Sequence, residues 1–588
     1  MCSIIGYSEI GEVAPILVDG LQKMEYRGYD SVGIAILNNG KLLIRKGIGK
    51  VAEVNASLGL KEMPGQLGIG HTRWATHGGV TDLNAHPHSA CSANVAVVHN
   101  GVIENYHELR DCLLKDGHVF KSQTDSEVIA HLLEHYWALK NDIKEAMIHT
   151  CNRLLGSFAF VAIFEDSTLC GARYDEPLII GIKPDGYFIS SDVLGFLDYT
   201  DRAIFLDNRD IVMLEGNNIS LINFDGDKVN RTPTQVAWEL GSADKGRYTH
   251  FTLKEIYEQS QTIFTSIHQT KPNLETFCDI LAKADDVFIT GSGTSYHSAL
   301  LAKHILSRYS KIRVESIMSS EFQYSSELLD KNSVLIAISQ SGETADVLQS
   351  VKSTKQKGAR VLSIVNVSTS SLARLSDCFL EVKCGPEIGV AATKSFTSQL
   401  SIIYYIADRV GGNLTGISTE WRELSNAIEK TLQLETKIAE IAAQVKDVKD
   451  IYILGRSIHF PICLEGALKI KELAYIHAEG IAAGELKHGP LALIDTNSLV
   501  IILNPYDSTY VDTLSNASVI KSRGAKLIGI SNKQDPIYDY CISIPYVKES
   551  LLPLVEVIPL QMLAYHLALY NNADPDYPRN LAKSVTVK

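Results

Sequence analysis

Several features are scarce in this 588-residue chain, and each scarcity excludes a class of protein. Lys and Arg number 55 against 68 Asp and Glu, giving a net charge of −13, so the basic face of a nucleic-acid-binding protein is missing. No uninterrupted apolar run reaches the roughly 18 residues of a membrane span. The N-terminus carries no basic segment ahead of an apolar one, so a secretory signal peptide is not indicated. We therefore expect a soluble protein whose partners are neither nucleic acids nor membranes.

The cysteines bear on the cellular compartment. The chain has ten of them and no CxxC pair. This pattern favours a reducing compartment, the cytoplasm, with most thiols buried in hydrophobic cores.

The length predicts several domains, because single hydrophobic cores stop growing near about 250–300 residues. Residues 1–237 alternate β-rich runs with turn signals, and the turns lie at Asn39-Gly40, Pro184-Asp185-Gly186 and Asp225-Gly226. Helical periodicity occurs at Ala14–Met24 and Ser126–Leu139. We predict an α+β domain over 1–237 and a polar linker over 238–252.

An internal repeat follows the linker. Three strand-like segments recur at offsets of 164, 165 and 166 residues, beginning at Asp286 and Asp450, Asn332 and Asn497, and Gly358 and Gly524. We predict two αβα subdomains with parallel sheets at 253–430 and 431–575, followed by a tail at 576–588.

Cys2 is the first candidate catalytic residue. If Met1 is removed, Cys2 carries a thiol and a free α-amine, which titrates near about 7.7–8.0 and can serve the thiol as a general base. The alternative is an inert, small apolar residue at the start of the strand Ser3–Gly6. The catalytic prediction is therefore conditional on the removal of Met1.

Polar motifs in the first domain suggest what such a nucleophile would attack. Asn100 and Gly101 follow an apolar strand, and an amide side chain beside a backbone N–H is suited to hold an oxyanion. Arg73 pairs well with an α-carboxylate, and Asp125 with an α-ammonium. The predicted substrate is an amino acid that places an acyl group next to Cys2.

A metal site is a competing interpretation of the same region. Five histidines lie close together in sequence, His71, His77, His86, His88 and His99. Their spacing fits no zincin pattern, so we expect no metal here, and a purely structural role for these histidines stays open.

The second domain carries a candidate phosphate loop. The strand Val334–Ile338 runs into the segment Ser339–Thr344, and a helical run begins at Ala345. Hydroxyls and backbone N–H groups at a helix N-terminus bind phosphate without a lysine, although such a loop is also an ordinary N-cap. The loop lacks GxxxxGK[ST], so it is not a nucleotide P-loop. The matching segment Asn504–Thr509 has lost the hydroxyl-rich pattern, and we expect only the first half to bind phosphate.

Acid–base candidates occur late in the chain. Glu465, Lys469 and Glu472 fall on one face of a predicted helix, where a solvated ion-pair face is the alternative. His488 lies in the acid- and base-rich loop that follows. Lys583 lies in a tail that is mobile by default, unless it folds over a carbonyl substrate and forms a Schiff base.

Together these motifs resemble the glutamine–fructose-6-phosphate aminotransferase (isomerising) family, from Cys2 through Tyr26–Ser31 to the tail at Asn580–Val587. The resemblance implies an N-terminal-nucleophile (αββα) glutaminase domain followed by two tandem αβα sugar-isomerase (SIS) subdomains. It implies hydrolysis of glutamine, channelling of the ammonia, and conversion of fructose 6-phosphate to glucosamine 6-phosphate. That reaction opens amino-sugar (hexosamine, UDP-N-acetylglucosamine) synthesis.

The resemblance also assigns roles in the glutamine half. Cys2 would be the nucleophile, with Asn100 and Gly101 holding the oxyanion. Glutamine would be bound by Arg73, Thr76, His77 and Asp125. The gate of an ammonia tunnel would comprise Trp74, Arg27 and Tyr29.

Further roles follow for the sugar half. The sugar phosphate would be held by Ser339, Gln340, Ser341 and Thr344, with Thr294 and Ser295 nearby. His488 would open the sugar ring, and Lys583 would form the Schiff base. Glu472 would move the proton between C1 and C2, assisted by Lys469 and Glu465.

Some positions depart from the family pattern. Ser292 stands where many relatives have a cysteine, and Ser260 stands where a proline often follows the glutamine. The departures leave open an amidotransferase for another ketose phosphate, and a sugar-phosphate-sensing binding protein is a further alternative. The resemblance implies no cofactor and no metal, and a homodimer formed through the isomerase halves.

Overall fold

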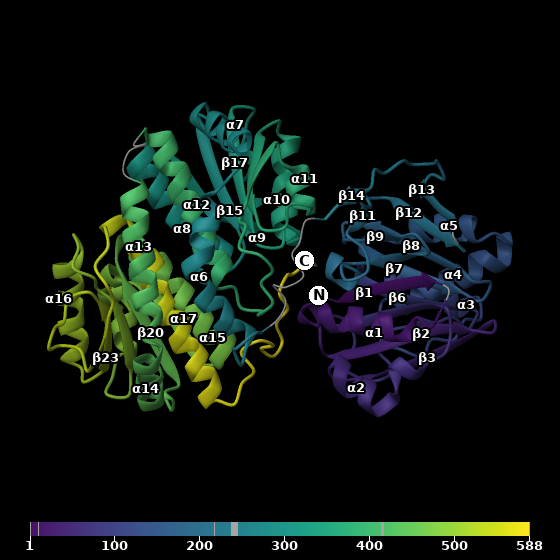
Figure 1. Cartoon of the computed structure of the whole chain (residues 1–588), viewed down its shortest axis with the longest axis horizontal. Helices are drawn as coiled ribbons and strands as arrows, with labels where there is room; N and C mark the ends of the chain where they lie inside the picture. Colours follow the sequence, from purple (N-terminus) through teal and green to yellow (C-terminus); the bar gives the residue numbers. More distant parts are fainter. Residues whose placement is uncertain (1, 10, 217, 237–244, 413–416, 587–588) are drawn as a thin grey trace. The chain divides into compact units, whose positions relative to one another are not determined.

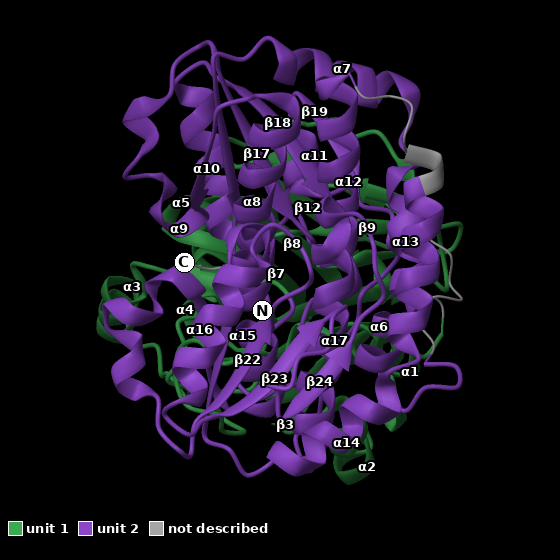
Figure 2. Ribbon diagram, turned by 90° about the vertical axis from the view of Figure 1, so that its left-hand side faces the viewer, with its two compact units in different colours: residues 1–241, 584–588 green, residues 242–583 purple. Residues whose placement is uncertain are grey.

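The computed structural model describes residues 2–9, 11–216, 218–236, 245–412 and 417–586. Its internal contacts divide the chain into two compact units, Met1–Gly241 with Ser584–Lys588, and Ser242–Lys583 (Figure 2). Residues 238–244 of the predicted linker at 238–252 lie outside the described residues, and the described remainder leads into helix α6 (Phe251–Ile267), which begins inside the predicted linker. The exact domain bounds stay a prediction.

Two β-sheets form the centre of the first unit. The eight-stranded sheet has the order β14-β11-β9-β10-β1-β4-β2-β3. Its strands are β1 (Ser3–Glu9), β2 (Ser31–Asn38), β3 (Lys41–Ile48), β4 (Leu67–Arg73), β9 (Ile179–Lys183), β10 (Gly186–Ser190), β11 (Arg202–Phe205) and β14 (Thr234–Gln235). The six-stranded sheet has the order β13-β12-β8-β7-β6-β5. Its strands are β5 (His88–Ser89), β6 (Val95–Ile103), β7 (Gly156–Phe164), β8 (Thr168–Tyr174), β12 (Asp210–Glu215) and β13 (Asn218–Asn223).

Helices cover the outer faces of these sheets. The unit contains α1 (Ala14–Lys23), α2 (Val51–Leu58), α3 (Tyr106–Lys115), α4 (Glu127–Lys140) and α5 (Ile143–Arg153). One hydrophobic cluster joins the facing sides of the two sheets, and another joins the six-stranded sheet to its helices. The layers are therefore αββα, as the resemblance implied (Figure 1).

The hairpin predictions are confirmed at two of three turns. β2 pairs with β3 across Asn39-Gly40, and β9 pairs with β10 across the turn at Pro184. After Asp225-Gly226 only an isolated bridge, Ile222 to Lys228, forms in place of a second strand. The predicted helices at Ala14–Met24 and Ser126–Leu139 correspond to α1 and α4.

The second unit contains the predicted repeat. Its two five-stranded sheets have the orders β16-β15-β17-β18-β19 and β21-β20-β22-β23-β24, and every pairing in them is parallel. The first sheet comprises β15 (Asp286–Gly291), β16 (Val314–Met318), β17 (Ser333–Ser339), β18 (Arg360–Val365) and β19 (Cys378–Glu381). The second comprises β20 (Asp450–Gly455), β21 (His477–Ala482), β22 (Leu499–Leu503), β23 (Lys526–Ser531) and β24 (Tyr540–Ser543). The strand order reverses between β15 and β17, the position where doubly wound sheets bind ligands.

Helices pack around both parallel sheets. They are α6, α7 (Lys271–Ala282), α8 (Thr294–Ile305), α9 (Ser319–Phe322), α10 (Ala345–Gln356), α11 (Ser371–Leu375), α12 (Lys394–Gly411), α13 (Ile417–Leu432), α14 (Glu435–Val445), α15 (Phe460–Ala474), α16 (Tyr510–Lys521) and α17 (Leu552–Tyr570). Two short 3₁₀ segments matter for the sites. The segment η7 (Ser457–His459) precedes α15, and η8 (Ala483–His488) follows β21.

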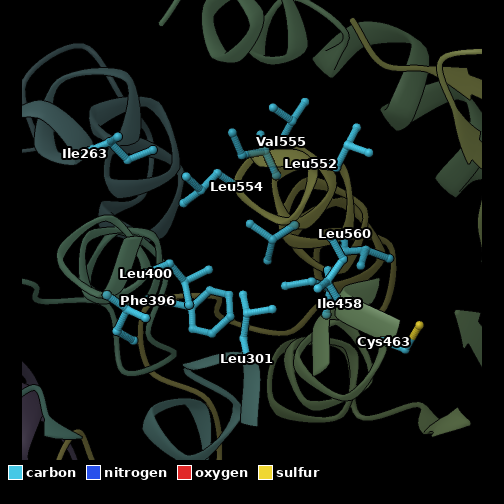
Figure 3. Close-up of a cluster of buried hydrophobic side chains, with 14 of the residues drawn as sticks. Ile263, Leu301, Phe396, Leu400, Ile458, Cys463, Leu552, Leu554, Val555 and Leu560 are labelled. Carbon is cyan, nitrogen blue, oxygen red and sulfur yellow. The ribbon is translucent and has the colours of Figure 1, made fainter. Parts of the chain in front are cut away.

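The core of the second unit lies where helices of its two halves meet. Figure 3 shows Leu301 of α8 and Phe396 of α12 near Leu554 and Leu560 of α17. Among the described residues, the segment Glu549–Tyr570 is long and apolar enough for a membrane span, with a mean hydropathy of 1.5. Of its most apolar stretch 94% is buried inside the protein, which is typical of a core helix.

Candidate active sites

Cys2 immediately precedes β1, at one end of the eight-stranded sheet. Ser3 pairs with Thr72 of β4, so Cys2 lies beside the end of that strand. The Cys2 Sγ atom accepts a hydrogen bond from the Trp74 backbone N–H at 3.3 Å. Burial raises the pKa of the Cys2 thiol, although the Trp74 N–H and the Arg73 charge oppose the rise. A neutral thiol needs a general base to become a nucleophile.

The Asn100 side chain points at Cys2. Asn100 Nδ2 donates to the Cys2 carbonyl oxygen at 3.1 Å, and Gly101 lines the same pocket. The Asn100 Oδ1 atom lies 3.2 Å from His71 Nε2, which is also 3.0 Å from the His99 carbonyl. Burial lowers the pKa of His71 to about 3, so His71 is neutral and donates from Nε2 to both oxygens. His71 thereby fixes the orientation of the Asn100 amide.

We expect Asn100→Ala to lower the kcat of glutamine hydrolysis by about 10²–10³-fold with little change in KM. The amide would stabilise charge that develops only as the thiolate attacks, so its loss affects the transition state more than bound glutamine. Steady-state glutaminase assays that determine kcat and KM separately check this prediction. An increase in KM alone, with kcat unchanged, would contradict the oxyanion role.

The predicted glutamine-binding residues gather around one small cavity. Its walls include Cys2, Arg73, Trp74, Thr76, His77, Gly101 and Asp125. The cavity has a volume of about 10 Å³, room for about one water molecule. Binding of a glutamine side chain therefore requires the lining side chains to move apart.

Arg73 and Asp125 are both held by backbone groups of this pocket. The Arg73 guanidinium donates to the carbonyls of His77 and Gly79, at 2.5 and 3.1 Å. Asp125 Oδ2 accepts from the Ile103 N–H at 2.8 Å. Both residues line the same pocket, so the structure brings together the two ends of the predicted clamp.

Two of the three predicted gate residues, Trp74 and Arg27, contact Cys2. Trp74 contacts the Cys2 sulfur through its backbone, and Arg27 Nε lies 3.5 Å from the Cys2 carbonyl oxygen. Arg27 also forms an ion pair with Asp192 at 2.8 Å. Tyr29 lies half-buried two residues beyond Arg27. Their role as a gate stays a prediction.

The predicted phosphate loop connects β17 to α10. Ser339 Oγ lies 3.1 Å from Thr344 Oγ1 and accepts from the Gly342 N–H at 3.0 Å. Gly342 has a φ of +69°, and a Cβ there would lie 2.1 Å from Ser370 Oγ, so only glycine fits. No side chain caps α10, and its first N–H groups remain available to an anion. Gln340 and Ser341 are half-buried in the same turn.

We expect Ser339→Ala to weaken fructose 6-phosphate binding by about tenfold, which corresponds to the loss of about one hydrogen bond. The matched control is Ser508→Ala in the equivalent loop of the second half, which should leave the affinity unchanged. The dissociation constants of the two variants for fructose 6-phosphate test this prediction. Equal losses in both variants would contradict a phosphate site confined to the first half.

The equivalent loop of the second half holds a buried ion network instead. His459 Nε2 lies 2.8 Å from Asp507 and its Nδ1 lies 2.8 Å from Glu556. Burial lowers the pKa of His459, but the two carboxylates outweigh it and raise the pKa to about 10. The Asp507 carboxylate occupies the loop where the first half has hydroxyls, and its charge disfavours a phosphate.

This network predicts a pH-dependent stability. The folded pKa of His459 lies above the ordinary value of 6.5, so its stabilisation is complete below about pH 6.5 and is lost as the pH rises towards 10. We expect the free energy of unfolding to fall over this window by at most about 1.4 kcal/mol per pH unit. His459→Gln should destabilise by about 3–5 kcal/mol, because two buried carboxylates lose their cation. Unfolding curves between pH 6 and 10 test this, and an identical pH slope in His459→Gln would contradict it.

The acid–base face of α15 is buried, so a solvated ion-pair face is the wrong interpretation. Lys469 Nζ lies 3.4 Å from Glu465 and 2.5 Å from Glu472, and it donates to Thr294 Oγ1 at 3.1 Å. The side chains of Glu465 and Lys469 are fully buried, whereas Glu472 is 21% exposed. Burial lowers the pKa of Lys469, but the carboxylates of Glu465 and Glu472 raise it overall, so Lys469 stays charged. Glu472 is therefore the member of the cluster that a substrate can reach.

Thr294 and Ser295, at the start of α8, differ in their surroundings. Thr294 Oγ1 also donates to Glu465 Oε1 at 3.1 Å and thus belongs to the ionic cluster. Ser295 Oγ accepts from Gln399 at 3.2 Å in the helix-packed interior. Of these two residues, Thr294 is the one in direct contact with the acid–base residues.

Lys583 is held in place rather than left mobile. Its Nζ donates to Glu387 Oε2 at 2.5 Å and to the Gly389 carbonyl at 2.8 Å, and its side chain is 3% exposed. Glu387 also contributes to raising the pKa of Lys469, so the Lys583 contact and the α15 cluster lie within electrostatic range. The structure thus places the predicted Schiff-base lysine near the predicted proton-transfer residues.

His488 is a predicted catalytic residue for which the described part of the chain shows no contact with this cluster. It is exposed at the end of η8, and no hydrogen bond or ion pair of His488 is found there. Its role in opening the sugar ring stays a prediction.

Sequence reasoning missed several buried groups around both sites. They include Glu176, which raises the pKa of Cys2 and accepts from Thr586 at 2.8 Å. His71 was considered as a metal ligand or a structural residue, but its contact with Asn100 was missed. Glu255 and Glu387 were also missed. Burial and the neighbouring Glu387 raise the pKa of Glu255 to about 8, whereas the Glu387 pKa falls to about 2, because Lys583 and backbone donors outweigh its burial. No local motif marks these carboxylates.

The fold and both sites define a two-part enzyme, a glutamine amidotransferase joined to a pair of sugar-isomerase domains. Residues 71–198 match the glutamine amidotransferase domain family, and residues 280–409 and 444–570 each match the SIS domain family.

Curated relatives match along their whole length. A glutamine–fructose-6-phosphate aminotransferase [isomerizing] from Pyrococcus horikoshii is 45% identical, and one from Thermococcus kodakarensis is 42% identical, with each pair of chains covered completely. The C-terminal domain of glucosamine-fructose-6-phosphate aminotransferase from Francisella tularensis is a similar solved structure, with 35% identity and a TM-score of 0.53. It covers 57% of this chain and 99% of its own.

The chain belongs to the glutamine–fructose-6-phosphate aminotransferase [isomerizing] family. The comparisons favour this reading over an amidotransferase for another ketose phosphate and over a sugar-phosphate-sensing binding protein.

Proposed function

We propose that the chain hydrolyses glutamine at Cys2 and uses the ammonia to convert fructose 6-phosphate to glucosamine 6-phosphate. The observation that carries the proposal is the presence of two unlike sites in one chain. One is a half-buried thiol beside an oriented amide, and the other comprises a phosphate loop and a buried lysine–carboxylate cluster.

In the glutaminase half, the α-amine of a processed Cys2 takes the thiol proton, and the thiolate attacks the glutamine amide carbon. Asn100 and the Gly101 N–H stabilise the resulting oxyanion. Collapse of this intermediate expels ammonia and leaves a glutamyl thioester on Cys2, which water hydrolyses to glutamate. Arg73 and Asp125 bind the two charged ends of the amino acid throughout.

In the isomerase half, the loop Ser339–Thr344 holds the phosphate, and the open-chain sugar presents its C2 carbonyl to Lys583. The amine of Lys583 condenses with C2 and releases water, and ammonia then displaces the lysine to leave an imine at C2. Glu472 takes a proton from C1 and returns it to C2, while the C1 hydroxyl loses a proton and the imine nitrogen gains one, which gives the aldehyde at C1 and the amine at C2. The exchange is redox-neutral and needs no cofactor. His488 is assigned to ring opening on the family resemblance alone.

Ammonia transfer explains why both sites share a chain. Free ammonia is mostly protonated at neutral pH, and ammonium is not a nucleophile, so a dry route preserves the reactive form. We assign the gate of this route to Trp74, Arg27 and Tyr29. Hexosamine synthesis, a cytoplasmic location and a homodimer formed through the isomerase halves complete the proposal.

The test is formation of glucosamine 6-phosphate from glutamine and fructose 6-phosphate by the full chain, with mass spectrometry showing that Met1 is absent. A panel of other ketose phosphates should give at most slow turnover. A processed chain that hydrolyses glutamine yet forms no glucosamine 6-phosphate would overturn the proposal.

A further inference from the structure

Four potential metal ligands converge on the first unit, away from the glutamine pocket. Cys91 lies in the turn between β5 and β6, His118 follows α3, and His131 and Glu134 lie one turn apart on α4. Their ligand atoms all lie within 4.8 Å of one another. The histidines weighed as metal ligands in the sequence include neither His118 nor His131, because three separate segments build this group.

The distances match a tetrahedral site. A zinc ion with bonds of about 2.0–2.1 Å to nitrogen or oxygen and about 2.3 Å to sulfur separates its ligands by about 3.3 Å (N···O) and about 3.6 Å (S···N). Cys91 Sγ lies 3.6 Å from His131 Nδ1 and 3.8 Å from His118 Nδ1. Glu134 Oε2 lies 3.2 Å from His118 Nδ1 and 3.8 Å from His131 Nδ1. The four atoms therefore need only small shifts to surround one ion.

The same geometry argues against a cysteine–histidine catalytic relay. In a relay, the thiol and the carboxylate contact opposite nitrogens of one imidazole. Here the Cys91 sulfur and the Glu134 carboxylate approach the same nitrogen, Nδ1, of each histidine. Such convergence is the arrangement of ligands around a shared centre.

Surrounding groups orient the ligands. His131 directs its other nitrogen, Nε2, towards Glu127 Oε1 at 3.5 Å, and metal-bound histidines commonly donate that N–H to a carboxylate. Glu127 is itself fixed by the N–H groups of Lys121 and Ser122, both at 2.7 Å. The Val119 N–H donates to Cys91 Sγ at 3.2 Å, a contact suited to a thiolate. One thiolate, two imidazoles and one carboxylate form a donor set typical of zinc.

We propose that Cys91, His118, His131 and Glu134 bind one structural Zn²⁺ ion. The four protein ligands close the site, so the ion stabilises the fold and takes no part in the reaction. It ties the β5–β6 turn and the segment after α3 to α4, whose N-terminus begins two residues after the glutamine-binding Asp125.

The test measures zinc by inductively coupled plasma mass spectrometry in the full chain, purified without chelators. We expect about one zinc per chain in the wild type and in Cys112→Ser, a control at another exposed cysteine of the same unit. Cys91→Ser should bind zinc at least about 100-fold more weakly in competition with a chelating dye. Because Cys91 is exposed, this variant is expected to fold.

A second measurement does not depend on a variant. Chelator-treated wild-type protein titrated with Co²⁺ should develop a thiolate-to-cobalt charge-transfer band that Cys91→Ser lacks. Wild-type protein that neither carries nor takes up zinc, or Cys91→Ser that retains zinc at wild-type affinity, would overturn the site. Another metal bound in place of zinc would overturn the assignment of the ion.

Discussion

We expect Cys2→Ala to abolish glutamine-dependent formation of glucosamine 6-phosphate, by at least about 10⁴-fold, while ammonia-dependent formation continues. The thiol is the sole nucleophile assigned to the glutamine pocket, where it lies beside the Trp74 N–H and the Asn100 amide. Ammonia added to the medium bypasses this step, because the sugar site lies in the other unit of the chain. Parallel assays of glucosamine 6-phosphate formation, one with glutamine and one with ammonium salt at raised pH, check that only the glutamine-dependent activity is lost.

The matched control for this variant is Cys112→Ser, which alters an exposed thiol on α3 and should keep both activities. Loss of ammonia-dependent synthesis in Cys2→Ala would show that Cys2 also serves the sugar site. Retention of glutamine-dependent synthesis would exclude Cys2 as the nucleophile.

The second large effect is expected at Lys583. We expect Lys583→Arg to lower the amination of fructose 6-phosphate by at least about 10³-fold with glutamine or with ammonia, because a guanidinium cannot form a Schiff base. Arginine keeps the charge that the buried Glu387 carboxylate requires. Lys583→Ala should lose the same activity and also destabilise the chain by about 3–5 kcal/mol, because Glu387 then lacks its cation. The two variants separate chemistry from folding.

Borohydride trapping provides the direct readout for Lys583. Reduction of the wild-type chain in the presence of fructose 6-phosphate should attach the sugar phosphate to the peptide that contains Lys583. Lys487→Ala, a substitution at an exposed lysine on η8, serves as the control and should keep both the adduct and the activity. An adduct on a different lysine, or full activity in Lys583→Arg, would contradict the assignment.

Much of the fold is predictable from sequence because its signals are local. The repeat in the second unit is visible because its buried parallel strands are short apolar runs, and the three offsets preserve the register. The phosphate loop is equally local, because β17, the turn and α10 are consecutive in the chain.

The sites are less predictable where distant segments meet. His71 orients Asn100 although their strands, β4 and β6, belong to different sheets. Glu387 lies 196 residues from Lys583, and nothing in its neighbourhood marks it as the partner of that lysine. Glu465 and Lys469 have the spacing of a surface ion pair, and only the packing of α15 against other elements of the unit, among them α8 with Thr294, buries them.

The central claim is that ammonia released at Cys2 reaches the sugar without leaving the protein. Its most direct test is a reaction of amide-¹⁵N-labelled glutamine with fructose 6-phosphate in a pool of unlabelled ammonium, followed by mass spectrometry of the glucosamine 6-phosphate. We predict that the product carries the ¹⁵N label almost without dilution. Product labelled only in proportion to the mixed ammonium pool would contradict the coupling of the two sites.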